Sequence, residues 1–154
     1  MWSPHGPCNS IRESKEWMAG ILRSSENDHR SWAINSVHET APEDTIGIIS
    51  LLLRNHAGRK EPMGWELGYL FRPQAWGKGF ATEACGAAVE SLRRDLNGKR
   101  GTVKAATDIS NKKSLRVLAK LGFKFDEHKV FGGPQRFLGG EWRPHEIMWF
   151  TRSL

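Results

Sequence analysis

Cysteine is scarce in this sequence. The chain of 154 residues contains two cysteines, Cys8 and Cys85, and they do not form a Cys-x-x-Cys pair. Two isolated cysteines make no disulfide framework, and the six histidines lack the spacing of metal ligands. We therefore expect neither a disulfide-stapled secreted protein nor a zinc site, and we expect a reducing, cytoplasmic compartment.

Long apolar runs are also lacking. No stretch approaches the roughly 20 apolar residues that a membrane-spanning helix needs. Residues 1–7 have neither the basic start nor the apolar stretch of a signal peptide. These absences predict a chain without a membrane partner.

Acidic residues are outnumbered by basic ones. The chain has 23 Lys and Arg against 17 Asp and Glu, a net charge of +6 with His neutral. This excess favours an anionic partner, such as a nucleotide cofactor, RNA or an acidic surface, unless the charge is simply spread over the surface. The aromatic and basic residues form no array of the kind that binds single-stranded RNA, so a nucleic acid is not expected.

The remaining composition is that of a globular protein. Hydrophobic residues make up 38% and charged residues 26%, which predicts a single domain over residues 1–154. Periodicity and turn residues predict helices at 10–23, 80–96 and 111–121, and strands at 31–37, 45–54, 64–71, 102–108, 123–131 and 144–152. Strand 64–71 should run antiparallel to its predecessor and parallel to strand 102–108, and Gly47 should mark a bulge or a close contact.

The loop after strand 64–71 is the most informative stretch. A helix N-terminus offers unpaired amides and partial positive charge, and Gly77 and Gly79 let the backbone approach an anion or take a positive φ. These features predict a pyrophosphate site, although an ordinary strand-to-helix loop can also contain Gly-x-Gly. The Gly-x4-Gly-Lys-Ser/Thr pattern of a P-loop is missing, and Thr82 stands where a Rossmann fingerprint has its third small residue.

Two motifs together resemble a known family. They are Gln74-x-x-Gly77-x-Gly79-Phe80-Ala81-Thr82-Glu83-Ala84 and, further along, Asn111-x-x-Ser114-x-x-Val117-Leu118-x-Lys120-Leu121-Gly122-Phe123. Over roughly residues 8–152 the chain resembles the GCN5-related N-acetyltransferase (GNAT) superfamily, and within it the ribosomal-protein N-terminal acetyltransferase (Rim-type) branch. The resemblance implies an α/β fold with a mixed, splayed β-sheet and helices on both faces. It also implies acetyl transfer from acetyl-CoA to an amine, either a protein N-terminus or a small molecule.

The resemblance also assigns roles in donor binding. The diphosphate of acetyl-CoA would be held by the loop residues Gln74, Ala75, Trp76, Gly77, Lys78 and Gly79, followed by Phe80. The backbone of Leu70, Phe71 and Arg72 would pair with the pantetheine arm and polarise the thioester carbonyl, in a segment that usually carries a bulge. Asn111 would hydrogen-bond the pantetheine region, although helix capping alone explains an asparagine there.

Two residues are candidates for catalysis. Glu66 would act as the base, through water, although a solvated strand glutamate is an equal explanation. Ser114 would be a weak acid, because Leu118 stands where many members have a tyrosine; a first-turn helix serine is the alternative. Cys85 falls inside a helix without a histidine beside it, so we expect direct transfer without a covalent intermediate.

One departure from the family pattern is expected at the N-terminus. The family begins with a strand and a helix before the element predicted at Ser10, and this chain is expected to lack both. The sheet edge left exposed would favour a homodimer. Two other functions remain as alternatives: a non-catalytic CoA-binding module, and a basic interaction protein associated with RNA or the ribosome.

Overall fold

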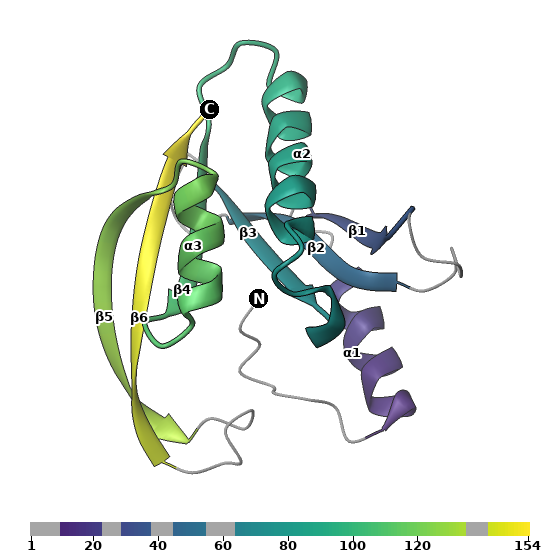
Figure 1. Ribbon diagram of the computed structural model, residues 1–154, viewed down its shortest axis with the longest axis vertical. Helices are drawn as coiled ribbons and strands as arrows, with labels where there is room; N and C mark the ends of the chain where they lie inside the picture. The colour runs from purple at the N-terminus through teal and green to yellow at the C-terminus, as the bar shows by residue number, and fades with distance from the viewer. Residues whose placement is uncertain (1–9, 23–28, 38–44, 55–63, 135–141) are drawn as a thin grey trace.

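All nine predicted helices and strands are present in the structure. The computed structural model describes residues 10–22, 29–37, 45–54, 64–134 and 142–154. In chain order these ranges form α1 (Ile11–Leu22), β1 (His29–Asn35), β2 (Thr45–Arg54), β3 (Gly64–Phe71), the short 3₁₀ turn η1 (Pro73–Ala75), α2 (Phe80–Asp95), β4 (Thr102–Asp108), α3 (Lys112–Lys120), β5 (Lys124–Pro134) and β6 (Trp142–Ser153). Figure 1 shows their arrangement.

The strands form one mixed sheet that opens in the middle. Its order is β1-β2-β3-β4-β6-β5, and all described neighbours are antiparallel except β3 and β4, as predicted. The parallel pairing of β3 with β4 comprises only Trp65 with Val103 and Glu66 with Lys104. Beyond these pairs β4 stays with β6 while β3 diverges, so β1–β3 and β4–β6 run to different sides in Figure 1. The expected splayed sheet is confirmed.

One face of the sheet carries the hydrophobic core. Side chains alternate between the faces of a strand, and the buried ones of β3 and β4 fall on the odd-numbered positions. These positions pack under α2 and α3, which contact each other. Helix α2 contributes Cys85, Ala88, Val89 and Leu92, and α3 contributes Leu118. Helix α1 lies away from both in Figure 1, and whether it covers the opposite face stays a prediction.

The N-terminal elements that the family pattern includes do not appear in the described part of the chain. There, no strand or helix precedes α1, and β1 forms an edge of the sheet. Residues 1–9, including Cys8, lie outside the described residues. The homodimer through this edge stays a prediction.

Gly47 makes the close contact that was one of its two expected roles. A Cβ at this position would lie 2.4 Å from Cδ1 of Phe71 and 2.8 Å from the carbonyl oxygen of Leu70. The register of β1 with β2 also shifts beside it, between Ile34 and Asn35. Only a glycine therefore lets the end of β3 lie this close to β2.

Replacing Gly47 by alanine should destabilise the protein. The added methyl group must displace a buried ring and approaches a backbone oxygen, and overpacking of this kind costs roughly 1–3 kcal/mol. Urea unfolding would measure the change. Gly86→Ala in α2 is the matched control, because its Cβ would lie at an ordinary 3.4 Å from Leu121 Cδ2. That variant should be as stable as the wild type or more stable, since alanine favours helix; equal stability of both variants would contradict the prediction.

Candidate active site

The gap between the diverging halves of β3 and β4, here called the β3–β4 opening, exposes backbone groups of β3. Arg72 N donates to Ile46 O at 2.9 Å, and the register of β2 with β3 is continuous from there. Because hydrogen-bonded pairs alternate along an antiparallel ladder, Leu70 and Gly68 pair with β2, whereas the backbone groups of Phe71 and Tyr69 point toward the opening. Phe71 was among the expected donor-binding residues; Tyr69 was not.

Two details of this segment differ from the expectation. The continuous register shows that β3 has no bulge against β2 in the described part of the ladder, so the sheet opens only because β4 follows β6. The backbone of Arg72 is also engaged, since its carbonyl accepts from Ala75 N at 2.9 Å. The side chains of Leu70 and Arg72 are exposed.

The glycine loop (residues 76–79) joins η1 to α2 at the end of β3. Gly77 has φ +78° and Gly79 has φ +89°, and a Cβ on either would meet no atom within 4 Å. Glycine is therefore favoured by the backbone conformation rather than by a lack of space. Gly79 caps α2 without a side-chain hydrogen bond, and its carbonyl accepts from Thr82 N and Glu83 N.

This geometry leaves several amides without a backbone partner. Among the described residues, the amides of Gly77, Gly79, Phe80 and Ala81 have no backbone acceptor. Gln74 and Lys78 lie in the same exposed segment, while Ala75 is buried beneath it. Unpaired amides at a helix N-terminus bind phosphate groups, so the residues present fit the diphosphate of acetyl-CoA.

Trp76 connects the glycine loop to two other elements. Its indole Nε1 donates to the Phe71 carbonyl at 2.8 Å, and Lys113 Nζ of α3 lies 3.9 Å from the centre of its ring. The cation–π contact and the hydrogen bond fix the loop against the end of β3 and the first turn of α3. Neither the hydrogen bond to Phe71 nor the contact with Lys113 was expected, because the sequence carries no signal for either contact.

The first turn of α3 forms the other wall of the opening. Asn111 caps the helix, with its Oδ1 accepting from Ser114 N at 3.1 Å, so the capping role is confirmed. Ser114 is half-buried, and its carbonyl oxygen accepts from the Tyr69 hydroxyl at 3.4 Å. Burial raises the pKa of Tyr69 to about 12.

Glu66 lies on the opposite side of the sheet from Ser114. Its neighbours Trp65 and Leu67 are buried in the core, so strand alternation points Glu66 away from α2 and α3. It stands at the last pair before the strands diverge, opposite Lys104, whose Nζ donates to Asp126 Oδ2 at 3.2 Å. The two predicted catalytic residues are thus brought to the same opening from different faces.

Cys85 is placed as expected for a core residue. Its side chain is fully buried in α2, and burial raises the pKa of its thiol to about 12. The thiol therefore stays protonated at neutral pH and is no nucleophile.

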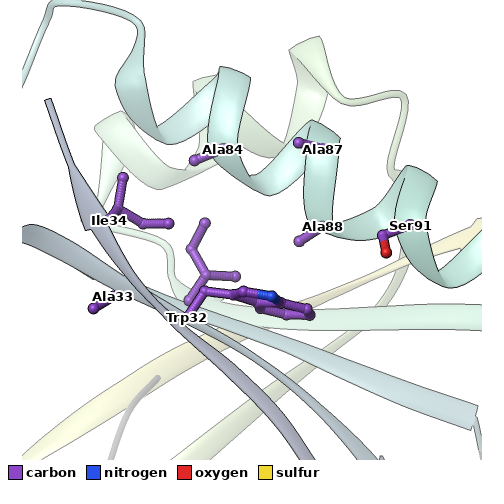
Figure 2. Close-up of a pocket in the computed structure, with 8 residues that line it drawn as sticks. Trp32, Ala33, Ile34, Ala84, Ala87, Ala88 and Ser91 are labelled. Carbon is purple, nitrogen blue, oxygen red and sulfur yellow. The ribbon is translucent and has the colours of Figure 1, made fainter. Parts of the chain in front are cut away.

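A separate hollow lies at the far edge of the sheet. It has a volume of about 290 Å³ and lies between α2 and strands β1 and β2 (Figure 2). Its lining is mostly apolar: Trp32, Ala33, Ile34, Ile49, Ala84, Ala87, Ala88 and Ser91. The alanines of α2 are too small to fill the space above Trp32, and the hollow supplies none of the groups described at the β3–β4 opening.

The described residues were also searched for metal-binding clusters and membrane-spanning helices. They contain no cluster of three His, Cys, Asp or Glu side chains that could hold a metal ion. In the same ranges, no helix combines the length and apolar character needed to cross a membrane.

Comparison with known structures supports the fold. An acetyltransferase of the GNAT family from Bacillus anthracis has a TM-score of 0.68 at 19% identity, covering 98% of this chain and 78% of that one. Spermidine N-acetyltransferase from Vibrio cholerae, in complex with CoA and spermine, has a TM-score of 0.68 at 20% identity, with 96% and 77% covered. No curated protein shows significant sequence similarity.

Comparison of the sequence with models of protein families shows the family of the chain. Residues 1–124 match the model of the acetyltransferase (GNAT) domain, which is most of the 154-residue sequence. Enzymes of this family take their acetyl group from acetyl-CoA, in agreement with the fit of the glycine loop to a diphosphate. The protein therefore belongs to the GNAT acetyltransferase family.

Proposed function

We propose that the protein transfers the acetyl group of acetyl-CoA directly to an amine. The observation that carries this proposal is the β3–β4 opening, which has the glycine loop with its unpaired amides at its end and the carboxylate of Glu66 at the point of divergence. The donor binds on the side of α2 and α3, with its diphosphate on the amides of Gly77 to Ala81. The acceptor approaches from the face that carries Glu66.

The residues around the opening have distinct tasks. Bound acetyl-CoA supplies a thioester, whose sulfur is a good leaving group. The Phe71 amide faces the opening and donates to the carbonyl oxygen as negative charge develops there. Glu66 accepts the proton of the attacking amine, directly or through one water. The C–N bond forms as the C–S bond breaks, and buried Cys85 takes no part.

The acceptor that fits best has one ammonium group beside an apolar group. On the face of Glu66, the side chains of Ile48 and Leu70 are paired across β2 and β3 and are 43% and 64% exposed. A polyamine would need several carboxylates in a row, whereas an apolar strip suits the first residues of a peptide. We therefore place the protein N-terminus, the acceptor of the Rim-type branch, ahead of spermidine, the acceptor named for a neighbour of similar fold.

Turnover on a small panel of amines tests this proposal. Peptides with an apolar first residue, the same peptides blocked by N-formylation, and spermidine are each incubated with acetyl-CoA. Mass spectrometry should show one added acetyl group on the free peptides only. Preferred acetylation of spermidine would overturn the choice of acceptor. Thermal stabilisation by CoA without turnover on any amine would instead support a non-catalytic CoA-binding module.

A further inference from the structure

Lys113 and Trp76 meet across the wide end of the β3–β4 opening. Trp76 follows the end of β3, whereas Lys113 lies in the first turn of α3, which follows the end of β4. Lys113 Nζ lies 3.9 Å from the centre of the Trp76 ring, and both residues are exposed. The contact therefore bridges the two halves of the sheet beside the glycine loop.

The two partners are held unequally. Trp76 is also fixed by the hydrogen bond from its indole Nε1 to the Phe71 carbonyl at 2.8 Å. Lys113 forms no ion pair with any described residue. A cation–π contact at an exposed site is weak, and the ammonium of a lysine is carried on a flexible four-carbon stem. Lys113 is therefore the partner that can move.

The charge of Lys113 opposes the helix that carries it. Helix α3 begins with Lys112 and Lys113, continues with Arg116 and Lys120, and contains no acidic residue. The N-terminus of a helix carries partial positive charge, so cations there are unfavourable to the helix. Residues that oppose local stability are expected mainly at functional sites. An anionic ligand therefore explains the cationic start of α3 better than helix stability does.

We propose that Lys113 leaves the Trp76 ring when acetyl-CoA binds and pairs with its diphosphate. The amides that fit the diphosphate begin at Gly77, the residue after Trp76, so Lys113 already lies beside them. A charged hydrogen bond to a phosphate oxygen is stronger than an exposed contact with a ring, so the exchange is favourable. The inference rests on the donor half of the proposed function and is independent of the acceptor.

The exchange gives α3 a part in donor binding. In the free protein, Lys113 links α3 directly to the glycine loop through Trp76. In the complex the diphosphate takes the charge of Lys113, so the link between α3 and the glycine loop passes through the donor. The affinity for CoA then contains a contribution from α3 that the amides of the glycine loop do not supply.

Calorimetric titration of Lys113→Met tests the contact with the diphosphate. Methionine keeps an unbranched apolar stem and removes the charge. We expect CoA to bind about 5- to 20-fold more weakly, a loss between that of an exposed ion pair and that of a well-formed charged hydrogen bond. The difference from wild type should shrink at high salt. Dephospho-CoA, which keeps the diphosphate but lacks the 3′-phosphate, should lose affinity equally.

Lys120→Met is the matched control. It removes the same charge from the same helix, and residue 120 lies two turns beyond Lys113, about 10 Å along the axis. This variant should bind CoA as the wild type does. An equal loss of affinity in both variants would mean that the net charge of α3 matters and that Lys113 makes no specific contact, which overturns the inference.

NMR of isotope-labelled lysine tests the exchange itself. The Hε resonance of Lys113, identified by its absence in Lys113→Met, should lie upfield in the free protein because the side chain lies over an indole ring. Addition of CoA should return it to the ordinary position, and Trp76→Leu should do the same without ligand. Neither measurement requires turnover.

Three further results would overturn the inference. They are an unchanged affinity of Lys113→Met for CoA, a loss that is absent with dephospho-CoA, and a lysine resonance that stays upfield when CoA is bound. If the resonance moves and Lys113→Met binds CoA more weakly, but wild type acetylates no amine, the inference stands and the proposed function fails instead.

Discussion

Gly79→Asp is expected to weaken binding of acetyl-CoA by at least about 100-fold, or about 2.7 kcal/mol. The substitution puts a carboxylate at the N-terminus of α2, beside the amides that would hold the diphosphate. Two like charges about 4 Å apart near a protein surface repel by about 4 kcal/mol, which exceeds the loss we predict. Calorimetric titration with CoA would measure the effect directly.

Two controls separate charge from conformation. Gly79→Asn has the same shape and tolerates a positive φ, so it should retain most of the affinity. Gly98→Asp, beyond the other end of α2, has φ +81° and equally open surroundings, and it should bind CoA as the wild type does. Tight binding by Gly79→Asp would mean that the glycine loop is an ordinary strand-to-helix turn.

Glu66→Gln should reduce kcat about 10²- to 10³-fold, because the amine loses its proton acceptor. The amide is close to the carboxylate in size, and Glu66 lies on the face away from the donor loop, so the dissociation constant of CoA should not change. Steady-state rates with the best peptide acceptor and calorimetry with CoA together test both parts of this expectation.

Glu127→Gln is the matched control for Glu66. Glu127 is also a strand glutamate, but it lies in β5 at the outer edge of the sheet, where it pairs with Lys129. Its replacement should leave kcat unchanged. If both variants lose activity equally, or neither does, Glu66 is a solvated strand residue and another group or solvent accepts the proton.

The order of the elements could be predicted because local patterns determine it. Alternating apolar residues in 64–71 and the apolar stripe after Phe80 have different periods, and Asn97-Gly98 and Gly122 end their helices with positive φ. The parallel pairing followed from a helix between two strands of one sheet. The same local signals located the glycine loop, since Gly77 and Gly79 adopt the backbone conformation that only glycine takes readily.

Which residues of β3 direct their backbone groups into the opening depends on the pairing register of β3 with β2. Local sequence patterns do not determine that register. The hydrogen bond from Arg72 to Ile46 determines that Phe71 and Tyr69, rather than Leu70, direct their backbone into the opening. A bulge would have reversed this assignment. The contact of Tyr69 with Ser114 joins residues 45 positions apart, and only the packed fold brings them together.

The short pairing of β3 with β4 has a mechanical consequence. In the described part of the chain only two register pairs join the halves of the sheet. The contacts of α2 with α3, of Tyr69 with Ser114 and of Trp76 with Lys113 also link them. Strands β1–β3 pair continuously with one another, and so do β4–β6. We therefore expect the two groups of strands to move relative to each other about the short β3–β4 pairing. A ligand in the β3–β4 opening would contact both groups of strands at a distance from the β3–β4 pairs, where their relative motion is largest. Donor binding should thus convert two cooperative units into one.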